Sequence, residues 1–134
     1  MHVTRVLQLM GTALLAVTLL FGAGSAYAHH SRAMYDPGKS VTVEGTVKDV
    51  AYKNPHVWVN LVVKDAQNRE QVWGMEGGNL GGLYRMGWTQ DTVKTGDKIK
   101  MEVHPMRDGM PGGQILRVTL ADGRVLGERG GRGY

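Results

Sequence analysis

The sequence contains no cysteine. This absence excludes disulfide bonds, thiolate metal sites and a cysteine nucleophile. No segment has the Gly-x-Ser-x-Gly pattern of a serine hydrolase. The glycine-rich run from Glu76 to Gly82 lacks the Lys-Ser/Thr pair that completes a phosphate-binding loop. These absences favour a binding or structural protein, and we do not expect an enzyme.

An excess of charge of one sign is also missing. The chain has 16 basic and 12 acidic residues, a formal net charge of +4. A nucleic-acid-binding domain usually carries a strong, clustered basic face. The mild net charge therefore does not indicate a nucleic-acid partner.

One long apolar run is present, and it lies at the amino terminus. Arg5 precedes the run from Val6 to Phe21, and Ala26-Tyr27-Ala28 follows it. A positive residue, an apolar segment and an A-x-A site together predict a secretory signal peptide over residues 1–28, cleaved after Ala28. An uncleaved membrane anchor is the alternative, since the run is about long enough to span a bilayer.

Cleavage after Ala28 leaves 106 residues that begin at His29. This length fits one domain with a modest core. The prediction places the protein in the periplasm or outside the cell, with membrane contact only through the signal peptide during export. Residues 127–134 are rich in glycine and arginine and predict a flexible tail. The folded domain is therefore expected over residues 29–126.

The middle of the chain alternates apolar and polar residues in short segments separated by turn residues. This pattern predicts strands at 41–47, 57–63, 69–75, 98–104 and 114–120, with one short helix at 79–86. The expected fold class is all-β with one short helix, in the order β-β-β-α-β-β. That order is typical of a five-stranded OB-like Greek-key barrel. An open β-sandwich or meander is the alternative.

Four histidines remain after the predicted cleavage: His29, His30, His56 and His104. His56 follows Asn54-Pro55 between the first two predicted strands, and His104 precedes Pro105 between the last two. In an OB-fold these two loops commonly contact ligands. We therefore expect the two rings to lie at one end of the barrel.

Cleavage after Ala28 also gives His29 a free α-amine. The amine and imidazole of one residue can chelate a single ion, and His56 or His104 could add a third nitrogen. Nitrogen donors of this kind favour Cu(II). The sequence therefore predicts a binding protein for a copper-type ion, with His30 as a substitute or supporting residue.

Two variants of this site stay open. Met106 and Met110 could add the thioether donors that suit Cu(I). Cleavage after Ala26 would leave His29 as the third residue, a pattern that also binds Cu(II) or Ni(II) through the amine, two backbone amides and the imidazole.

The alternative function is a structural or interaction module of the cell envelope without a metal. In that case the histidines only hydrogen-bond the loop backbone, and the partner is another envelope protein or a small polar ligand. Trp58 and Trp73 lie on the second and third predicted strands, which form the usual ligand face of an OB-fold. The ligand-face candidates are Trp58, Trp73, Met106, Arg107 and Asp108.

Several short motifs occur together in this chain. They are His29-His30-Ser31, Asn54-Pro55-His56-x-Trp58, Gly82-Leu83-Tyr84-Arg85-Met86-Gly87-Trp88, Lys94-x-Gly96-Asp97 and His104-Pro105-x-Arg107-Asp108-Gly109. The combination resembles a family of small exported bacterial proteins classed as a domain of unknown function. The resemblance implies an exported, periplasmic β-domain and no particular activity. Met86 departs from the basic residue associated with that helix, whereas the histidines match the motif positions and are candidate ligands.

Overall fold

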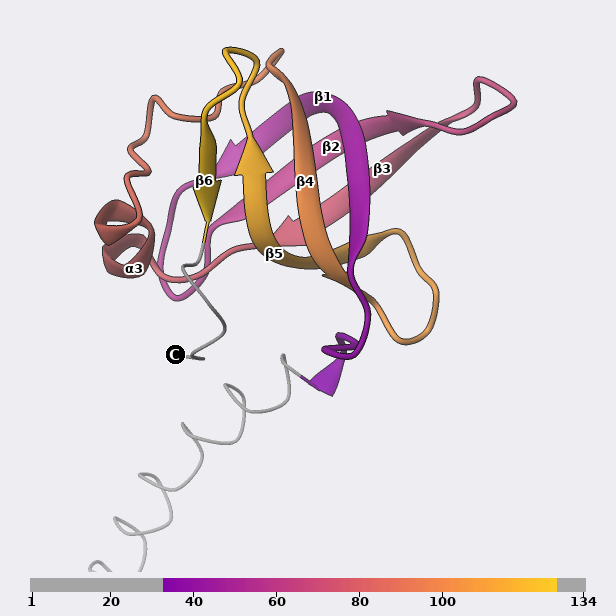
Figure 1. Ribbon diagram of the computed structural model, residues 1–134, viewed down its shortest axis with the longest axis horizontal. Helices are drawn as coiled ribbons and strands as arrows, with labels where there is room; N and C mark the ends of the chain where they lie inside the picture. The colour runs from indigo at the N-terminus through magenta and orange to yellow at the C-terminus, as the bar shows by residue number, and fades with distance from the viewer. Residues whose placement is uncertain (1–32, 128–134) are drawn as a thin grey trace, which may run out of the picture. The chain divides into compact units, whose positions relative to one another are not determined.

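The computed structural model describes residues 33–127 (Figure 1). The strands are β1 (Val41–Ala51), β2 (Trp58–Lys64), β3 (Glu70–Glu76), β4 (Lys98–Pro105), β5 (Gly112–Thr119) and β6 (Val125–Gly127), and the helix α3 (Leu80–Arg85) lies between β3 and β4. The predicted order β-β-β-α-β-β is confirmed. Within this described part, no helix is long and apolar enough to cross a membrane.

The strands form a closed barrel. The sheet order is β3-β2-β1-β4-β5-β6, and a further parallel pairing joins β3 to β5. That pairing matches Gly74–Glu76 with Gly112–Gln114 and closes the sheet on itself. A five-stranded barrel with this strand order is an OB-type barrel, so the predicted fold class is confirmed and an open sheet is excluded.

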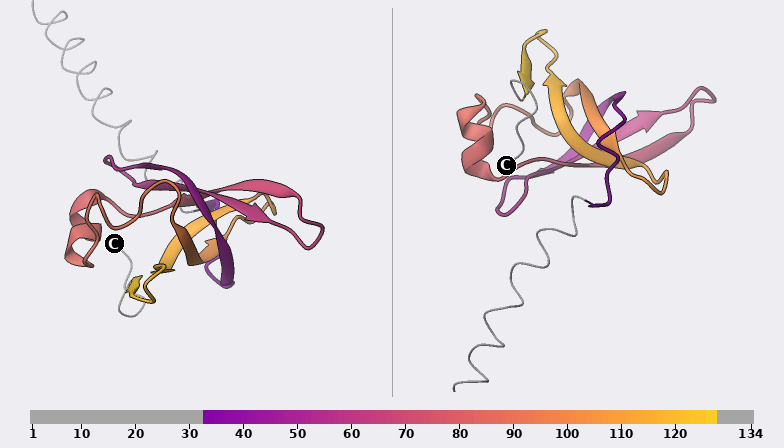
Figure 2. Two further views of the ribbon diagram at one scale, coloured as in Figure 1. Left: turned by 90° about the horizontal axis from the view of Figure 1, so that it is seen from above. Right: turned by 60° about the horizontal axis from the view of Figure 1, so that its bottom comes forward.

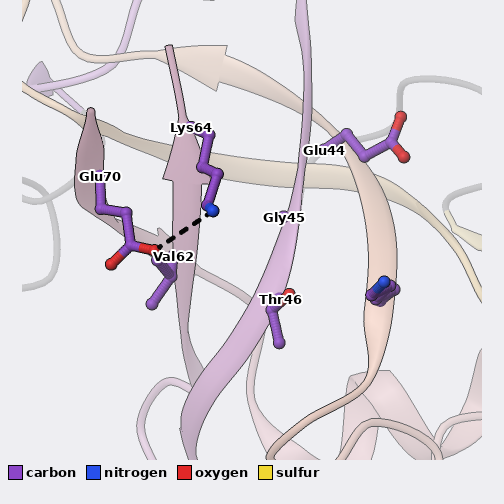
Figure 3. A pocket seen from close by; sticks show the side chains of 7 residues that line it. Glu44, Gly45, Thr46, Val62, Lys64 and Glu70 are labelled. Atoms are coloured by element: carbon purple, nitrogen blue, oxygen red, sulfur yellow. Dashed lines mark ion pairs between the residues drawn. The ribbon is translucent and has the colours of Figure 1, made fainter. Parts of the chain in front are cut away.

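Strand β1 changes its partner at Thr46. Val41 to Thr46 pair with β4, and Thr46 to Ala51 pair with β2. A Cβ atom at Gly45 would lie 2.6 Å from the carbonyl oxygen of Val62, so only glycine allows the two strands to approach so closely. Beyond this point β1 and the β2–β3 hairpin diverge, and a groove opens between them (Figure 3).

Apolar side chains at alternate positions along the strands fill the interior of the barrel. The buried side chains of β1, β2, β3, β4 and β5 are mainly valine, with Leu61, Met75, Ile99 and Met101. Leu83 of α3 joins the same cluster, as do Trp88 and Val93 of the loop that follows. Figures 1 and 2 show α3 on the side of the barrel opposite the projecting β2–β3 hairpin.

Hydrogen bonds at its first turn and a glycine after its last turn explain where α3 begins and ends. The side chain of Asn79 accepts a hydrogen bond from the Gly82 amide at 2.7 Å, which caps the first turn. The side chain of Asn54, in the β1–β2 loop, accepts another from the Leu80 amide at 3.1 Å. Gly87 ends the helix with a φ of 90°. The cap from Asn54 ties this helix to the loop that carries His56.

Strand β6 was not predicted. Val125 to Gly127 pair with Arg117 to Thr119 of β5. Three residues are too few to show an alternating pattern, and a Cβ atom at Gly127 would lie 2.6 Å from the Leu116 carbonyl oxygen. The sheet thus includes Gly127, which the sequence had assigned to the tail; residues 128–134 lie outside the described part.

Candidate functional site

The site is built around one buried carboxylate. Glu76 is the last residue of β3, and its side chain lies on the opposite face of the strand from the core residue Met75. An acidic residue on the outer face of a barrel is usually exposed. Glu76 is nevertheless only 4% exposed.

Two groups from distant parts of the chain bind this carboxylate. The hydroxyl of Tyr35 donates a hydrogen bond to Glu76 Oε2. His56 Nδ1 lies 3.1 Å from Glu76 Oε1 and 3.2 Å from the carbonyl oxygen of Gly77. One carboxylate oxygen therefore accepts from Tyr35, and the other lies at ion-pair distance from the His56 ring, whose Nδ1 hydrogen-bonds to the Gly77 carbonyl.

This arrangement fixes the tautomer of His56. Both groups that face Nδ1, the Glu76 carboxylate and the Gly77 carbonyl, are acceptors, so Nδ1 carries the proton. In the neutral ring Nε2 then keeps its lone pair. Within residues 33–127, no hydrogen bond to His56 Nε2 is formed.

His104 shows the same pattern with a different acceptor. It lies near the end of β4, and its Nδ1 is 2.7 Å from the carbonyl oxygen of Lys39. A carbonyl only accepts, so this ring also carries its proton on Nδ1. Its Nε2 likewise has no hydrogen-bond partner among the described residues.

The segment Tyr35–Ser40, which we call the N-terminal strap, runs along the end of β4. Tyr35 forms an isolated antiparallel bridge with Met106, and the Asp36 amide donates to the Pro105 carbonyl at 2.9 Å. Ser40 Oγ donates to Glu102 Oε1 at 2.8 Å. The strap therefore contacts Glu76 through the Tyr35 hydroxyl and His104 through the Lys39 carbonyl.

Tyr35 itself is 3% exposed. Burial, and after it the hydrogen bond to Glu76, raises the pKa of the Tyr35 phenol well above its usual value of about 10. The phenol therefore keeps its proton at neutral pH and remains a donor to the carboxylate.

Two paired glycines, which have no side chains, lie beside Glu76 in the sheet. Gly74 and Gly112 are register partners, and Gly74 shares the outer face of β3 with Glu76. A Cβ atom at Gly112 would lie 2.9 Å from the Gly74 carbonyl oxygen and 3.0 Å from Met106 Sδ. Met106 therefore packs against bare backbone next to the strap.

Strand register separates Glu76, which lies beside His56, from His104. Glu76 pairs with Gln114 on β5, and Gln114 pairs with His104 on β4, so a whole strand separates the Glu76 position from His104. Two strand spacings amount to about 10 Å. No group of three or more His, Asp or Glu residues suited to a metal ion occurs within residues 33–127. His29 and His30 lie outside the described residues.

Trp58 and Trp73 do not share a face. Trp58 pairs with Glu76, on the outer side, and is 36% exposed. Trp73 pairs with the core residue Leu61 and packs against the core. A ring stacked on Trp58 would not reach Trp73, so the two do not form one aromatic surface.

The other ligand-face candidates lie in the exposed β4–β5 loop. Arg107 and Asp108 are exposed, and Asp108 accepts a hydrogen bond from the Met110 amide at 2.9 Å. Met110 is 61% exposed. This loop has the character of a solvated turn, and Met106 alone packs next to the strap.

Sequence reasoning missed the central role of Glu76 and Tyr35. The sequence analysis named Glu76 only as the first residue of the glycine-rich run, just beyond the predicted third strand. Its burial depends on Tyr35, which is 41 positions away in the sequence. In the sequence, the only indication of this contact was a tyrosine close to the predicted mature terminus.

The chain matches one protein family and has a weak structural similarity to a known protein. Residues 16–115 match the model of a family described as "Family of unknown function (DUF6152)". A search of curated proteins finds no match. Among solved structures, the mitochondrial single-stranded DNA binding protein Rim1 of S. cerevisiae is similar at 8% identity and a TM-score of 0.47, over 62% of this chain and 94% of that one. No property of this chain follows from a similarity at that level.

Proposed function

Given that the chain belongs to this family of unknown function, we propose that it is an exported protein that binds a copper-type ion through His29 and His56. Cleavage after Ala28 would supply the amine and imidazole of His29, and His56 would supply Nε2. His104 Nε2 is a second position for the third nitrogen, and His30 a substitute for His29. The role is to hold or deliver the ion rather than to turn over a substrate.

One observation carries this proposal. Both described histidines donate Nδ1–H to an oxygen and leave Nε2 free of hydrogen bonds among the described residues. Metal-binding histidines in proteins almost always have this arrangement, because the oxygen acceptor fixes the ring and makes Nε2 more basic.

Chain length allows His29 to take part. His29 is six residues before Tyr35, and an extended stretch of that length spans at most about 20 Å. Tyr35 is bound to the same carboxylate as His56. The length of this connection is therefore compatible with His29 as a donor to the same ion.

The experiment uses protein exported by a bacterium with its own signal peptide. Native mass spectrometry of the intact protein gives the cleavage site, and a second spectrum after one equivalent of Cu(II) and buffer exchange gives the retained metal. We expect a chain starting at His29 with one copper. A matched chain that carries one additional residue ahead of His29 should lose the ion.

Two results would contradict the proposal. One is a correctly cleaved protein that takes up copper weakly or in several equivalents. The other is an extended chain that retains one ion as well as the cleaved protein does. Either would favour the interaction module, in which His56 and His104 serve only to fix the N-terminal strap. A chain cleaved after Ala26 that keeps one ion would retain copper binding and replace the donor set.

A further inference from the structure

The groove beside β1 is bordered by backbone groups that the barrel does not use. Val47 bonds to the segment just before β4: its amide donates to the Asp97 carbonyl at 2.8 Å, and its carbonyl accepts from the Gly96 amide at 2.8 Å. Along a strand, the side to which these groups point alternates from residue to residue. Thr42 and Glu44 therefore direct their N–H and C=O groups away from β4, into the groove.

These groups have no backbone partner on the groove side. The pairing of β1 with β2 begins at Thr46 and Val62, and it includes no residue before Thr46. Among residues 33–127, no hydrogen bond reaches the main chain of Thr42 or Glu44 from that side. Lys64 lies two positions beyond Val62, so its own N–H and C=O face the same gap from the opposite wall. The groove thus separates two open strand edges.

The side chains around the groove leave one cation unpaired. Glu44 lies 3.2 Å from Lys100 Nζ, and Glu70 lies 3.7 Å from Lys64 Nζ (Figure 3). Lys98 also lines the groove, at the end where β1 and β2 converge. It forms no ion pair within the described part of the chain. The converging end of the groove therefore carries a positive charge that an anion could neutralise.

The shape of the groove limits what can enter it. Its volume of about 750 Å³ lies within the range of about 300–1,000 Å³ that is typical of ligand sites. The groove closes at Gly45, where a Cβ atom would already lie 2.6 Å from the Val62 carbonyl oxygen. A strand lying along β1 must end there, because no third strand fits between β1 and β2. A carboxyl terminus ends a chain without a bend and supplies an anion for Lys98.

We propose that this groove binds the carboxyl-terminal end of an extended polypeptide from another protein. The bound segment adds as a strand beside Thr42 and Glu44, runs parallel to β1 and places its terminal carboxylate at Lys98. Strand addition gives affinity through the main chain and specificity through alternate side chains. Charged side chains on an open edge disfavour pairing between identical copies, which argues against a second copy as the occupant. The groove lies at the opposite end of β2 from His56, and its role is independent of copper.

The first measurement is amide hydrogen exchange on the exported protein without a peptide. We expect the amides of Thr42, Glu44 and Lys64 to exchange fast, whereas those of Val43 and Gly45, which face β4, are protected. Slow exchange at Thr42 and Glu44 in dilute protein would overturn the proposal. Protection that develops only at high protein concentration would also overturn it, because a second copy would then occupy the edge.

The second measurement uses a phage-displayed library of random heptapeptides whose carboxyl ends are free. Peptides selected on the exported protein are synthesised with a free carboxylate and, for comparison, with a terminal amide. We expect the free acids to protect the Thr42 and Glu44 amides from exchange. The amidated forms should bind about two- to fivefold more weakly, as expected for the loss of an exposed ion pair. Failure to enrich any peptide, or equal binding of acid and amide, would overturn the proposal.

Two pairs of variants then test the two contacts. Thr42→Pro removes an N–H that the barrel does not use and should weaken peptide binding about 10-fold, whereas the control Thr42→Ala keeps that N–H and the affinity. Lys98→Gln should abolish the difference between acid and amide. Its control Lys48→Gln, an exposed position of β1 that does not line the groove, should preserve the difference. If Thr42→Pro does not fold, the lysine pair still decides, because an unchanged difference in Lys98→Gln would contradict the assignment.

Discussion

The N-terminal strap is held at two places by opposite arrangements. At one end the strap provides the donor, the Tyr35 hydroxyl, and the barrel provides the buried Glu76 carboxylate, which also lies 3.1 Å from His56 Nδ1. At the other end the strap provides the acceptor, the Lys39 carbonyl, and the barrel provides His104. The first contact is buried and charged, whereas the second lies at the surface.

The difference separates two roles for a histidine. His56 Nδ1 hydrogen-bonds to the Gly77 carbonyl and also lies 3.1 Å from the Glu76 carboxylate. His104 is backed by a neutral carbonyl, and its main effect is to pin the strap. Under the proposed function, an Nδ1 hydrogen bond to a carbonyl would orient a metal ligand at His56, whereas at His104 it holds the strap.

The largest expected effect separates the two histidines by affinity. His56→Gln should weaken Cu(II) binding by at least about 100-fold, because a lost ligand costs more than the 10- to 100-fold of an outer partner. His104→Gln should change affinity far less. Titration of both exported variants by calorimetry measures the ratio, and equal losses would show that the carboxylate makes no difference.

Gly113→Ala should perturb the His104 end through the backbone. A Cβ atom there would lie 2.6 Å from Val103 Cγ2 and 2.7 Å from the His104 carbonyl oxygen. Overpacking of this kind costs about 1–3 kcal/mol. Urea unfolding gives the loss, and Gly109→Ala would not serve as a neutral control because Gly109 has a φ of 77°. Unchanged stability would mean that β4 and β5 can separate locally at no cost.

Tyr35→Phe should weaken the buried end of the strap. It removes a hydrogen bond to a charged acceptor, a contact worth about 1.5–3 kcal/mol. Hydrogen exchange should rise at the Asp36 amide, which donates to Pro105, more than at amides of β2. His104→Gln is the comparison, and a larger rise in that variant would reverse the ranking of the two ends.

The smallest effect concerns acid. The Gly38 amide, followed by Lys39, lowers the pKa of Asp36 below its ordinary value. The folded pKa is depressed, so the ionised side chain stabilises the strap turn above the unfolded pKa of about 3.9, and this contribution is lost as pH falls through the folded value. Exchange of the Gly38 amide should therefore increase below about pH 4. Asp36→Asn should show no such step, and an equal step in that variant would assign it to another acid.

The sequence predicted the barrel because alternation is a local signal. Val43 and Val47, or Ile99, Met101 and Val103, show their buried face without knowledge of their partners. Strand order, with one helix after the third strand, then selected the OB-type arrangement.

The site was predicted only in part, because its key contacts are not local. His56 and His104 were recognised as residue types, but their tautomers depend on the carbonyl groups of Gly77 and Lys39, which alternation cannot assign. The placement of Glu76 relative to His104 depends on the β3–β5 closure, since Glu76, Gln114 and His104 occupy successive strands. Trp73 faces the core for the same reason of register, opposite Leu61.

The position of Trp58 allows intrinsic tryptophan fluorescence to report where an ion binds. This indole is 36% exposed on the outer face, opposite Glu76 in register, whereas Trp88 is 2% exposed. Emission from a solvated indole lies at longer wavelength than emission from a buried one, and a paramagnetic ion quenches the nearest fluorophore most strongly. A paramagnetic ion held at His56 would therefore quench the long-wavelength part of the tryptophan emission most strongly. The wavelength range of the lost emission would report which tryptophan lies nearest to the ion.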